Sequence, residues 1–179
     1  MKLKALLTMA VAICGLQANA QTELYPKHFD LEQVTLLDGP MRTAMYKNFD
    51  VLMQYDVDRL LTPYVRQSGL ESAAVSGTKY HQWQSKHPNF SNWGDSSFDL
   101  SGHVGGHYLS ALALAYAACD DATMKAKLKE RMDYMVSVMK DCQDMYDNNT
   151  QGLYGFIGGQ PINSDWTALY SGRSEEHTV

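Results

Sequence analysis

Two histidines four residues apart are the residues whose types and spacing could do chemistry in this sequence. His103 and His107 stand in the stretch SGHVGGHYLSALALAYAAC, and an apolar helical pattern follows them. Residues at positions i and i+4 share one face of a helix, so both imidazoles would point to the same side. Such a pair could bind a metal ion, line a ligand pocket, or lie in the core as structural side chains.

The metal interpretation of this pair lacks two partners. No glutamate stands between the histidines in HVGGH, so the stretch has no base of the metalloprotease type. A zinc site also needs a third protein ligand, and none stands at a motif spacing. These absences weaken the metal interpretation without removing it. Beside it stand buried histidines bonded to the backbone and histidines on the wall of a binding pocket.

Three glycines around the histidines favour the pocket wall. Gly102, Gly105 and Gly106 fall at the start of the expected helix, where glycine is costly relative to alanine. Glycine at such places marks the close approach of another backbone or of a ligand. We therefore expect His103 and His107 to contact a ligand.

A polar, aromatic segment precedes the histidines. Residues 71–100 show no sustained period, and a loop of this length in a compact domain is usually functional or disordered. It contains five rings, which make disorder the weaker interpretation: Tyr80, Trp83, Phe90, Trp93 and Phe98. Flat rings such as Trp93 suit contact with the C–H faces of sugars, but they would equally serve to pin the loop to the core.

Paired carboxylates, the groups that run glycoside hydrolysis, give no convincing catalytic centre in this chain. The pairs are Asp56 with Asp58, Asp95 with Asp99, and Asp120 with Asp121. The first and last stand where helix caps and turns are expected, and the second falls in the polar loop. GLYGFIGGQP is not a phosphate loop, because it lacks the GK[ST] ending.

The elements that must position these residues are mainly helices. HFDLEQVTLLDGP alternates in polarity and predicts one or two short strands that end at the turn 38–40. A helical pattern then runs from Met41 to Tyr55. It restarts with Asp58 as the expected N-cap, carries Pro63 in about its first turn, and stops at Gly69.

A helical hairpin is expected after the loop. Its first helix begins near His103, and a turn at 119–121 leads to a second helix capped by Asp121. The second helix places apolar residues at steps of four and three: Leu128, Met132, Met135, Met139, Cys142 and Tyr146. Cys119 and Cys142 would then lie roughly 30 Å apart, so we interpret them as core residues rather than a disulfide.

The N-terminus has the pattern of an export signal. Lys2 and Lys4 precede a short apolar run, and Ala18-Asn19-Ala20 forms a cleavage site, so residues 1–20 are expected to be removed. Removal takes away two lysines and no acids, which changes the formal charge from −5 to −7. An acidic chain without a basic patch argues against nucleic acid, and no later run is long enough to span a membrane. We expect a periplasmic or extracellular protein that binds neutral ligands such as sugars.

The order of five motifs resembles a known family. HFDLEQVTLLDGP, DVDRLLTPYVRQSGL, GHVGGHYLSALALAYAAC, MVSVMKDCQ and GLYGFIGG are similar to the N-terminal part of the β-L-arabinofuranosidases of glycoside hydrolase families 127 and 146. The resemblance extends from about Phe29 to about Gly172. It implies an all-α fold in which residues 21–172 form the first hairpins of an (α/α)6 barrel, and it implies retaining hydrolysis of β-L-arabinofuranosides from plant glycans.

The resemblance also implies a zinc-bound cysteine nucleophile, cysteine and glutamate ligands, and a glutamate acid. Those positions would lie downstream of residue 179, and neither Cys119 nor Cys142 matches the clustered cysteines. What is carried over is a sugar-binding wall from Gly102 to Tyr108, which gives His103, His107 and Tyr108, together with Trp93, as the candidate substrate contacts. No metal ligand is assigned in this chain.

The end of the sequence departs from the family pattern. Residues 173–179, RSEEHTV, resemble the translation of a sequencing adaptor, and we interpret them as an artefactual tail on a truncated, inactive domain. Two alternative interpretations of the chain are open. One is a complete small exported helical protein that binds carbohydrate or another partner, and the other is a fragment of a different (α/α) barrel enzyme, such as a polysaccharide lyase. The oligomeric state and the exact glycan do not follow from the sequence.

Overall fold

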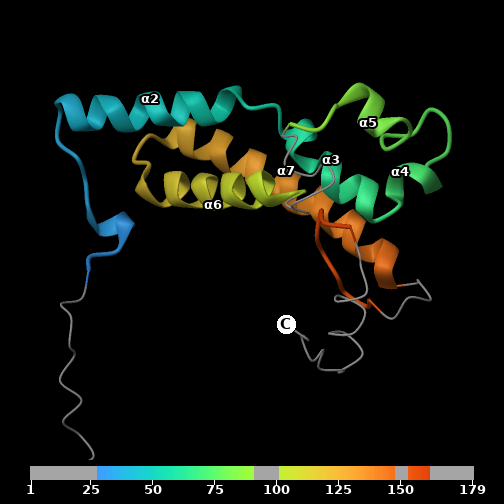
Figure 1. The fold of residues 1–179 in the computed structure, drawn as a ribbon. Helices are drawn as coiled ribbons and strands as arrows, with labels where there is room; N and C mark the ends of the chain where they lie inside the picture. Colours follow the sequence, from blue (N-terminus) through green and yellow to red (C-terminus); the bar gives the residue numbers. More distant parts are fainter. Residues whose placement is uncertain (1–27, 91–100, 148–152, 162–179) are drawn as a thin grey trace, which may run out of the picture. The chain divides into compact units, whose positions relative to one another are not determined.

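The computed structural model describes residues 28–90, 101–147 and 153–161. The chain divides into two units, residues 1–30 and 31–179, and every helix below belongs to the second. The described residues of this unit are helical, which confirms the predicted all-α class (Figure 1). The predicted signal segment and the predicted tail both lie outside the described residues.

The predicted short strands near the N-terminus are wrong. Residues Leu31–Gln33 form the 3-10 helix η1, and residues 34–37 have no regular structure. A strand needs a partner for its backbone groups, and the described residues supply none. Of the alternating apolar residues, Phe29, Leu31 and Val34 are exposed and Leu36 is half-buried, so they form no buried face here.

Two consecutive helices follow the turn at Gly39. Helix α2 spans Pro40–Gln54, begins with proline at a position where no N–H is needed, and buries Phe49 and Leu52. Helix α3 spans Val57–Gln67. Its N-cap is Asp56 rather than the predicted Asp58, because the Asp56 carboxylate accepts hydrogen bonds from the amides of Asp58 and Arg59.

Pro63 lies inside α3, later than the first turn predicted for it. Proline has no N–H, so the carbonyl of Arg59, four residues earlier, loses its helical partner. The amide of Phe90 donates to that carbonyl at 3.3 Å. The predicted stop at Gly69 is confirmed, since Gly69 has a φ of 76° between α3 and the short helix α4, Leu70–Ala73.

The predicted hairpin is confirmed. Helix α6 spans His103–Ala118 and packs along helix α7, Ala122–Asp147, as Figure 1 shows. The amide of Met124 donates to the Asp121 carboxylate at 2.7 Å, which is the predicted cap. The predicted inner face of α7 is buried except for Met132, which is half-buried. Helix α3 packs against both helices of the hairpin, and this contact brings α3 to the start of α6.

Candidate functional site

The start of α6 is fixed by a tyrosine from α3. The Tyr64 hydroxyl donates a 2.7 Å hydrogen bond to the carbonyl of Gly102, the N-cap residue of α6. Burial raises the pKa of Tyr64, so its hydroxyl stays a proton donor at neutral pH. Gly102 has a φ of 86°, which a residue with a side chain rarely adopts. Together these features set where the first turn of α6 begins.

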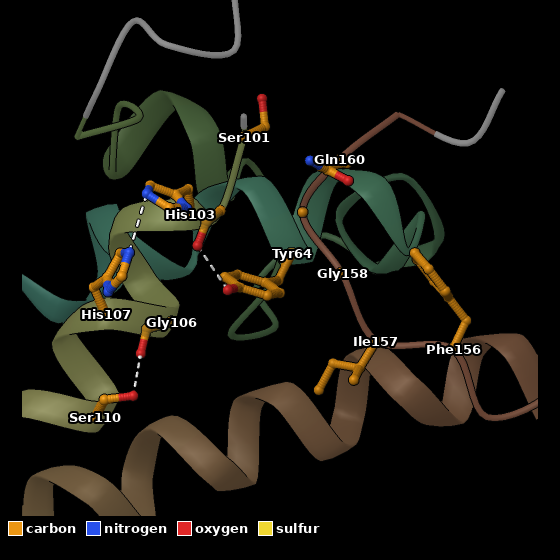
Figure 2. A pocket seen from close by; sticks show the side chains of 12 residues that line it. Tyr64, Ser101, His103, Gly106, His107, Ser110, Phe156, Ile157, Gly158 and Gln160 are labelled. Atoms are coloured by element: carbon orange, nitrogen blue, oxygen red, sulfur yellow. Dashed lines mark hydrogen bonds between the residues drawn. The ribbon is translucent and has the colours of Figure 1, made fainter. Parts of the chain in front are cut away.

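The two histidines of that turn face each other. Their Nε2 atoms lie 3.1 Å apart and the ring centroids lie 4.3 Å apart, as Figure 2 shows. One ring nitrogen must donate the proton of this bond and the other must accept it. His103 and His107 are both exposed, so the alternative of buried histidines bonded to the backbone does not describe the pair.

A second wall stands opposite the histidines. The segment 153–161 is attached to the end of α7 by a small cluster of Tyr146, Leu153 and Phe156, and the Gln143 side chain donates to the Gly155 carbonyl at 2.8 Å. Gly159 then meets the start of α6 at very close range. A Cβ placed on Gly159 would lie 2.9 Å from the Gly102 Cα, so neither backbone leaves room for a side chain.

These walls border an open cavity of about 430 Å³, within the size range of small-molecule sites. It is lined by Tyr64, by residues of the 101–110 stretch and by residues 156–160 (Figure 2). Its described lining holds no lysine, arginine, aspartate or glutamate. Ser101 also lines the cavity, is 4% exposed, and its hydroxyl has no hydrogen-bond partner within the described ranges. The arrangement can donate and accept hydrogen bonds to a neutral polar ligand.

Tyr108, another predicted contact, does not line this cavity. The Tyr108 side chain is buried in the core, where its hydroxyl donates to the Leu52 carbonyl at 2.6 Å and accepts from Arg131 at 3.0 Å. We therefore assign Tyr108 to the packing of α6 on α2 and α7. Trp93 and the pair Asp95/Asp99 lie outside the described residues.

Two of the described loop aromatics, Trp83 and Tyr80, pack against the core. Trp83, in the short helix α5 (Trp83–Lys86), is 2% exposed, and Tyr80 stacks beside it at 5.4 Å. The Tyr80 hydroxyl donates to the carboxylate of Asp141 on α7. For these two rings, pinning of the loop is the role that the structure supports, while the role of Trp93 stays a prediction.

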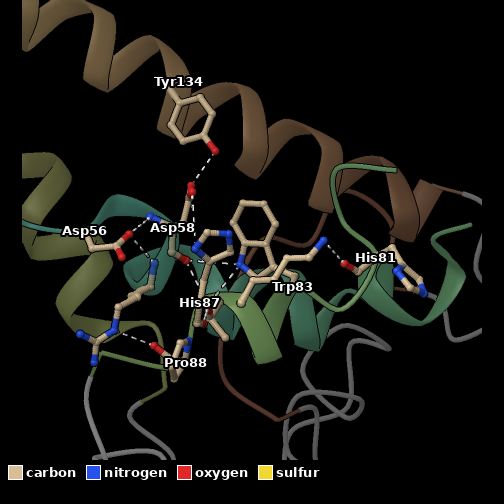
Figure 3. Close-up of polar contacts among 10 residues, drawn as sticks. Asp56, Asp58, His81, Trp83, His87, Pro88 and Tyr134 are labelled. Carbon is tan, nitrogen blue, oxygen red and sulfur yellow. Dashed lines mark hydrogen bonds and ion pairs between the residues drawn. The ribbon is translucent and has the colours of Figure 1, made fainter. Parts of the chain in front are cut away.

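A second polar cluster lies at the other end of α3. One oxygen or nitrogen each from Asp56, Asp58 and His87 lies within 4.8 Å of the other two, so the three could together approach a metal ion (Figure 3). His87 Nδ1 lies 3.7 Å from an Asp58 oxygen, and its ring stacks on Trp83 at 4.7 Å. Tyr134 donates to the other Asp58 oxygen at 2.6 Å.

This cluster has a structural explanation. The Asp56 carboxylate caps α3, and Asp58 links α3 to α7 through Tyr134 and to the loop through His87. The cap position also carries the positive end of the helix dipole, which opposes a cation. We assign the cluster to the joint between α3, α5 and α7.

The cysteines do not fit the zinc centre that the family resemblance implies. Cys119 and Cys142 are buried and free, and they stand at opposite ends of α7. Burial raises the pKa of Cys142 to about 11, whereas a zinc ligand must be a thiolate. No catalytic step through zinc is assigned to these two residues.

Part of the site was not predicted from the sequence. The sequence patterns do not mark Tyr64 or the segment 156–160 as pocket residues, although GLYGFIGG is one of the motifs that carry the family resemblance. The paired glycines 158–159 were the available signal, because adjacent glycines permit a backbone to approach another backbone closely. Which backbone they would meet depends on the packing of α7 on α3.

The class defined by this fold and site is an all-α protein with a cavity of about 430 Å³ beside a helix start, whose described lining holds no lysine, arginine, aspartate or glutamate. The family model described as Beta-L-arabinofuranosidase, GH127 catalytic domain, matches residues 33–172. The chain therefore belongs to this family of glycoside hydrolases, in agreement with the resemblance read from its motifs. No curated protein and no solved structure matches the chain. None of the helices in the described ranges is long and apolar enough to cross a membrane.

Proposed function

We propose that this chain is the N-terminal part of an exported enzyme that hydrolyses β-L-arabinofuranosides of plant glycans. In this proposal the cavity at the start of α6 binds the sugar, and His103 and His107 hydrogen-bond to its hydroxyls. The reacting groups, including the zinc centre of the family, lie outside this chain, which is inactive alone. The proposal depends chiefly on one observation, the exposed histidine pair at an uncharged cavity.

The chemistry of the cavity suits a neutral furanoside. A hydrogen-bonded imidazole pair presents both donor and acceptor capacity, and sugar hydroxyls use both. Phe156 and Ile157 supply apolar surface for the C–H face of a ring.

The lining speaks against the lyase alternative. A polysaccharide lyase acts on uronides, whose carboxylate needs a cationic partner in the site. No lysine or arginine is found in the described lining of the cavity, so a uronate would be held only by neutral groups and histidine. Release of unsaturated uronides by the full-length protein would nevertheless establish the lyase.

The test is hydrolysis by the product of the complete gene. We expect it to release arabinose from p-nitrophenyl β-L-arabinofuranoside and not from the α-anomer. His107→Ala should lower kcat/KM by about ten-fold, the value of one good hydrogen bond to substrate. His81→Ala is the matched control, because His81 lies outside the cavity lining. Unchanged kcat/KM in His107→Ala would show that this imidazole is structural.

A further inference from the structure

Helix α6 contains two glycines in its first turns, and only one of them is explained by packing. Alanine is preferred to glycine inside a helix, and α6 otherwise continues with the strong helix-forming stretch ALALAYAA. Either the packing of the protein or room for a ligand would explain a glycine there. Building a Cβ on each position separates these two cases.

Gly105 is required by packing. A Cβ at this residue would lie 2.9 Å from the Leu60 carbonyl oxygen of α3 and 3.1 Å from the Tyr64 ring. The Leu60 carbonyl is backbone and cannot turn aside, so the close contact of α6 with α3 excludes a side chain. Gly105 is also buried, as such a contact requires.

Packing does not explain why residue 106 is a glycine. It is exposed, and its φ is not in the left-handed region. Across the described ranges, the atom nearest to a built Cβ is the Tyr64 hydroxyl oxygen at 3.8 Å, an ordinary van der Waals distance. The fold as described would therefore accept alanine here and gain helix stability from it.

The place that a side chain of residue 106 would occupy faces the cavity at the start of α6. Gly106 lines the cavity together with His103, His107 and Ser110, which surround it on the same side of the helix (Figure 2). Its carbonyl already accepts a hydrogen bond from Ser110 at 3.2 Å. The missing side chain leaves a stretch of helix backbone exposed. This stretch lies beside the imidazoles of His103 and His107 and the hydroxyl of Ser110.

We propose that Gly106 is a specificity-determining residue, and that the sugar ring lies against its bare backbone, beside the hydrogen-bonded pair of His103 and His107. This inference rests on the proposed function, because it assumes that the cavity binds the sugar. A side chain at position 106 would occupy the place of the ring. The glycine thus costs stability and makes room for the ligand.

The first experiment measures stability. Thermal unfolding of Gly106→Ala, in the full-length protein, should show a Tm at or above that of the wild type, by up to about 4 °C. Gly105→Ala makes the same chemical change one residue earlier and should lower Tm. A Tm of Gly106→Ala clearly below the wild type would overturn the inference, because it would show that packing requires this glycine.

The second experiment measures binding and turnover. The dissociation constant for methyl β-L-arabinofuranoside, from NMR titration, should rise by about ten-fold in Gly106→Ala, the effect of one misplaced methyl group in a site. It should rise further in Gly106→Leu, and kcat/KM should fall in parallel. Equal binding by wild type and Gly106→Ala would overturn the inference while leaving the proposed function intact.

A panel of sugars separates the two proposals. If the wild type binds methyl β-D-xylopyranoside but no arabinofuranoside, and Gly106→Ala weakens that binding, the proposed function fails and the role of Gly106 stands. A wild-type protein that binds no sugar of the panel would overturn both. A Tm rise together with a loss of affinity is the combination that a purely structural glycine would not produce.

Discussion

The hydroxyl of Tyr64 donates a 2.7 Å hydrogen bond to the carbonyl of Gly102. This hydrogen bond connects α3 to the N-cap residue of α6. Tyr64 is 9% exposed, and its ring lies 3.2 Å from the position that a Cβ of Gly102 would occupy. The side chain thus acts as a support beneath the turn that carries the histidine pair. It also forms part of the cavity lining.

Removing this hydroxyl should loosen the start of α6. Tyr64→Phe keeps the ring and loses one partly buried hydrogen bond, so we expect a loss of about 1 kcal/mol in the free energy of unfolding. Urea denaturation measures this. Tyr154→Phe, at a residue that is 75% exposed, is the control and should change little. Equal stability of Tyr64→Phe and the wild type would mean that the Gly102 carbonyl finds another donor.

Gly105→Ala should destabilise the fold by about 1–3 kcal/mol, because its new methyl group would meet the Leu60 carbonyl at 2.9 Å. The backbones of α3 and α6 would have to separate to admit it. The measurement is chemical denaturation with the m-value monitored, so that a change in the unfolded state is recognised. A variant as stable as the wild type would show that the helices pack less closely than described.

The ion pair at the α6–α7 turn should make stability depend on pH in the acid range. The Arg42 guanidinium and the Tyr46 hydroxyl both donate to Asp120, and they lower the pKa of its carboxyl from 3.8 to about 2. A carboxyl with a lowered pKa contributes stability that is present above about pH 4 and is lost as pH falls toward 2.

Asp120→Asn should remove that part of the pH dependence. We expect the variant to be less stable than the wild type at pH 6 and the difference to shrink between pH 4 and pH 2. Denaturation at a series of pH values measures it, and the double variant Arg42→Met/Asp120→Asn should lose less than the sum of the single losses. A difference that stays constant down to pH 2 would contradict the assignment.

The cap of α3 can be tested by two substitutions at one residue. Asp56→Ala removes the acceptor for the amides of Asp58 and Arg59, and should cost about 1 kcal/mol of stability. Asp56→Asn keeps a capping oxygen and should stay close to the wild type. An asparagine variant as unstable as the alanine one would show that the charge of Asp56, rather than its cap, matters.

Local patterns predicted the helices well and the strands badly. The α7 spacing gave the buried face of Leu128, Met135 and Cys142 correctly, because helical period and burial are linked within one element. The N-terminal alternation failed because a strand depends on a partner elsewhere in the chain, which a local pattern does not contain. The cap is Asp56 rather than Asp58, because helix α3 starts two residues earlier than its pattern indicated.

The sequence by itself determined the family, the helical class, the hairpin with its Asp121 cap and the placing of His103 and His107 on one helix face. Each of these depends on spacing along the chain. Only the tertiary structure decided which side of α6 faces the core, and so placed Tyr108 inside and left both histidines exposed.

The tertiary structure also distinguished the glycines of the helix start. In the sequence, Gly102, Gly105 and Gly106 look alike. Gly102 meets Gly159, which lies 57 positions later, Gly105 meets Leu60 of α3, and Gly106 faces the cavity. The group that occupies the space beside each glycine comes from a segment far away in the chain. Only folding brings those segments together, so the sequence pattern does not identify the neighbour.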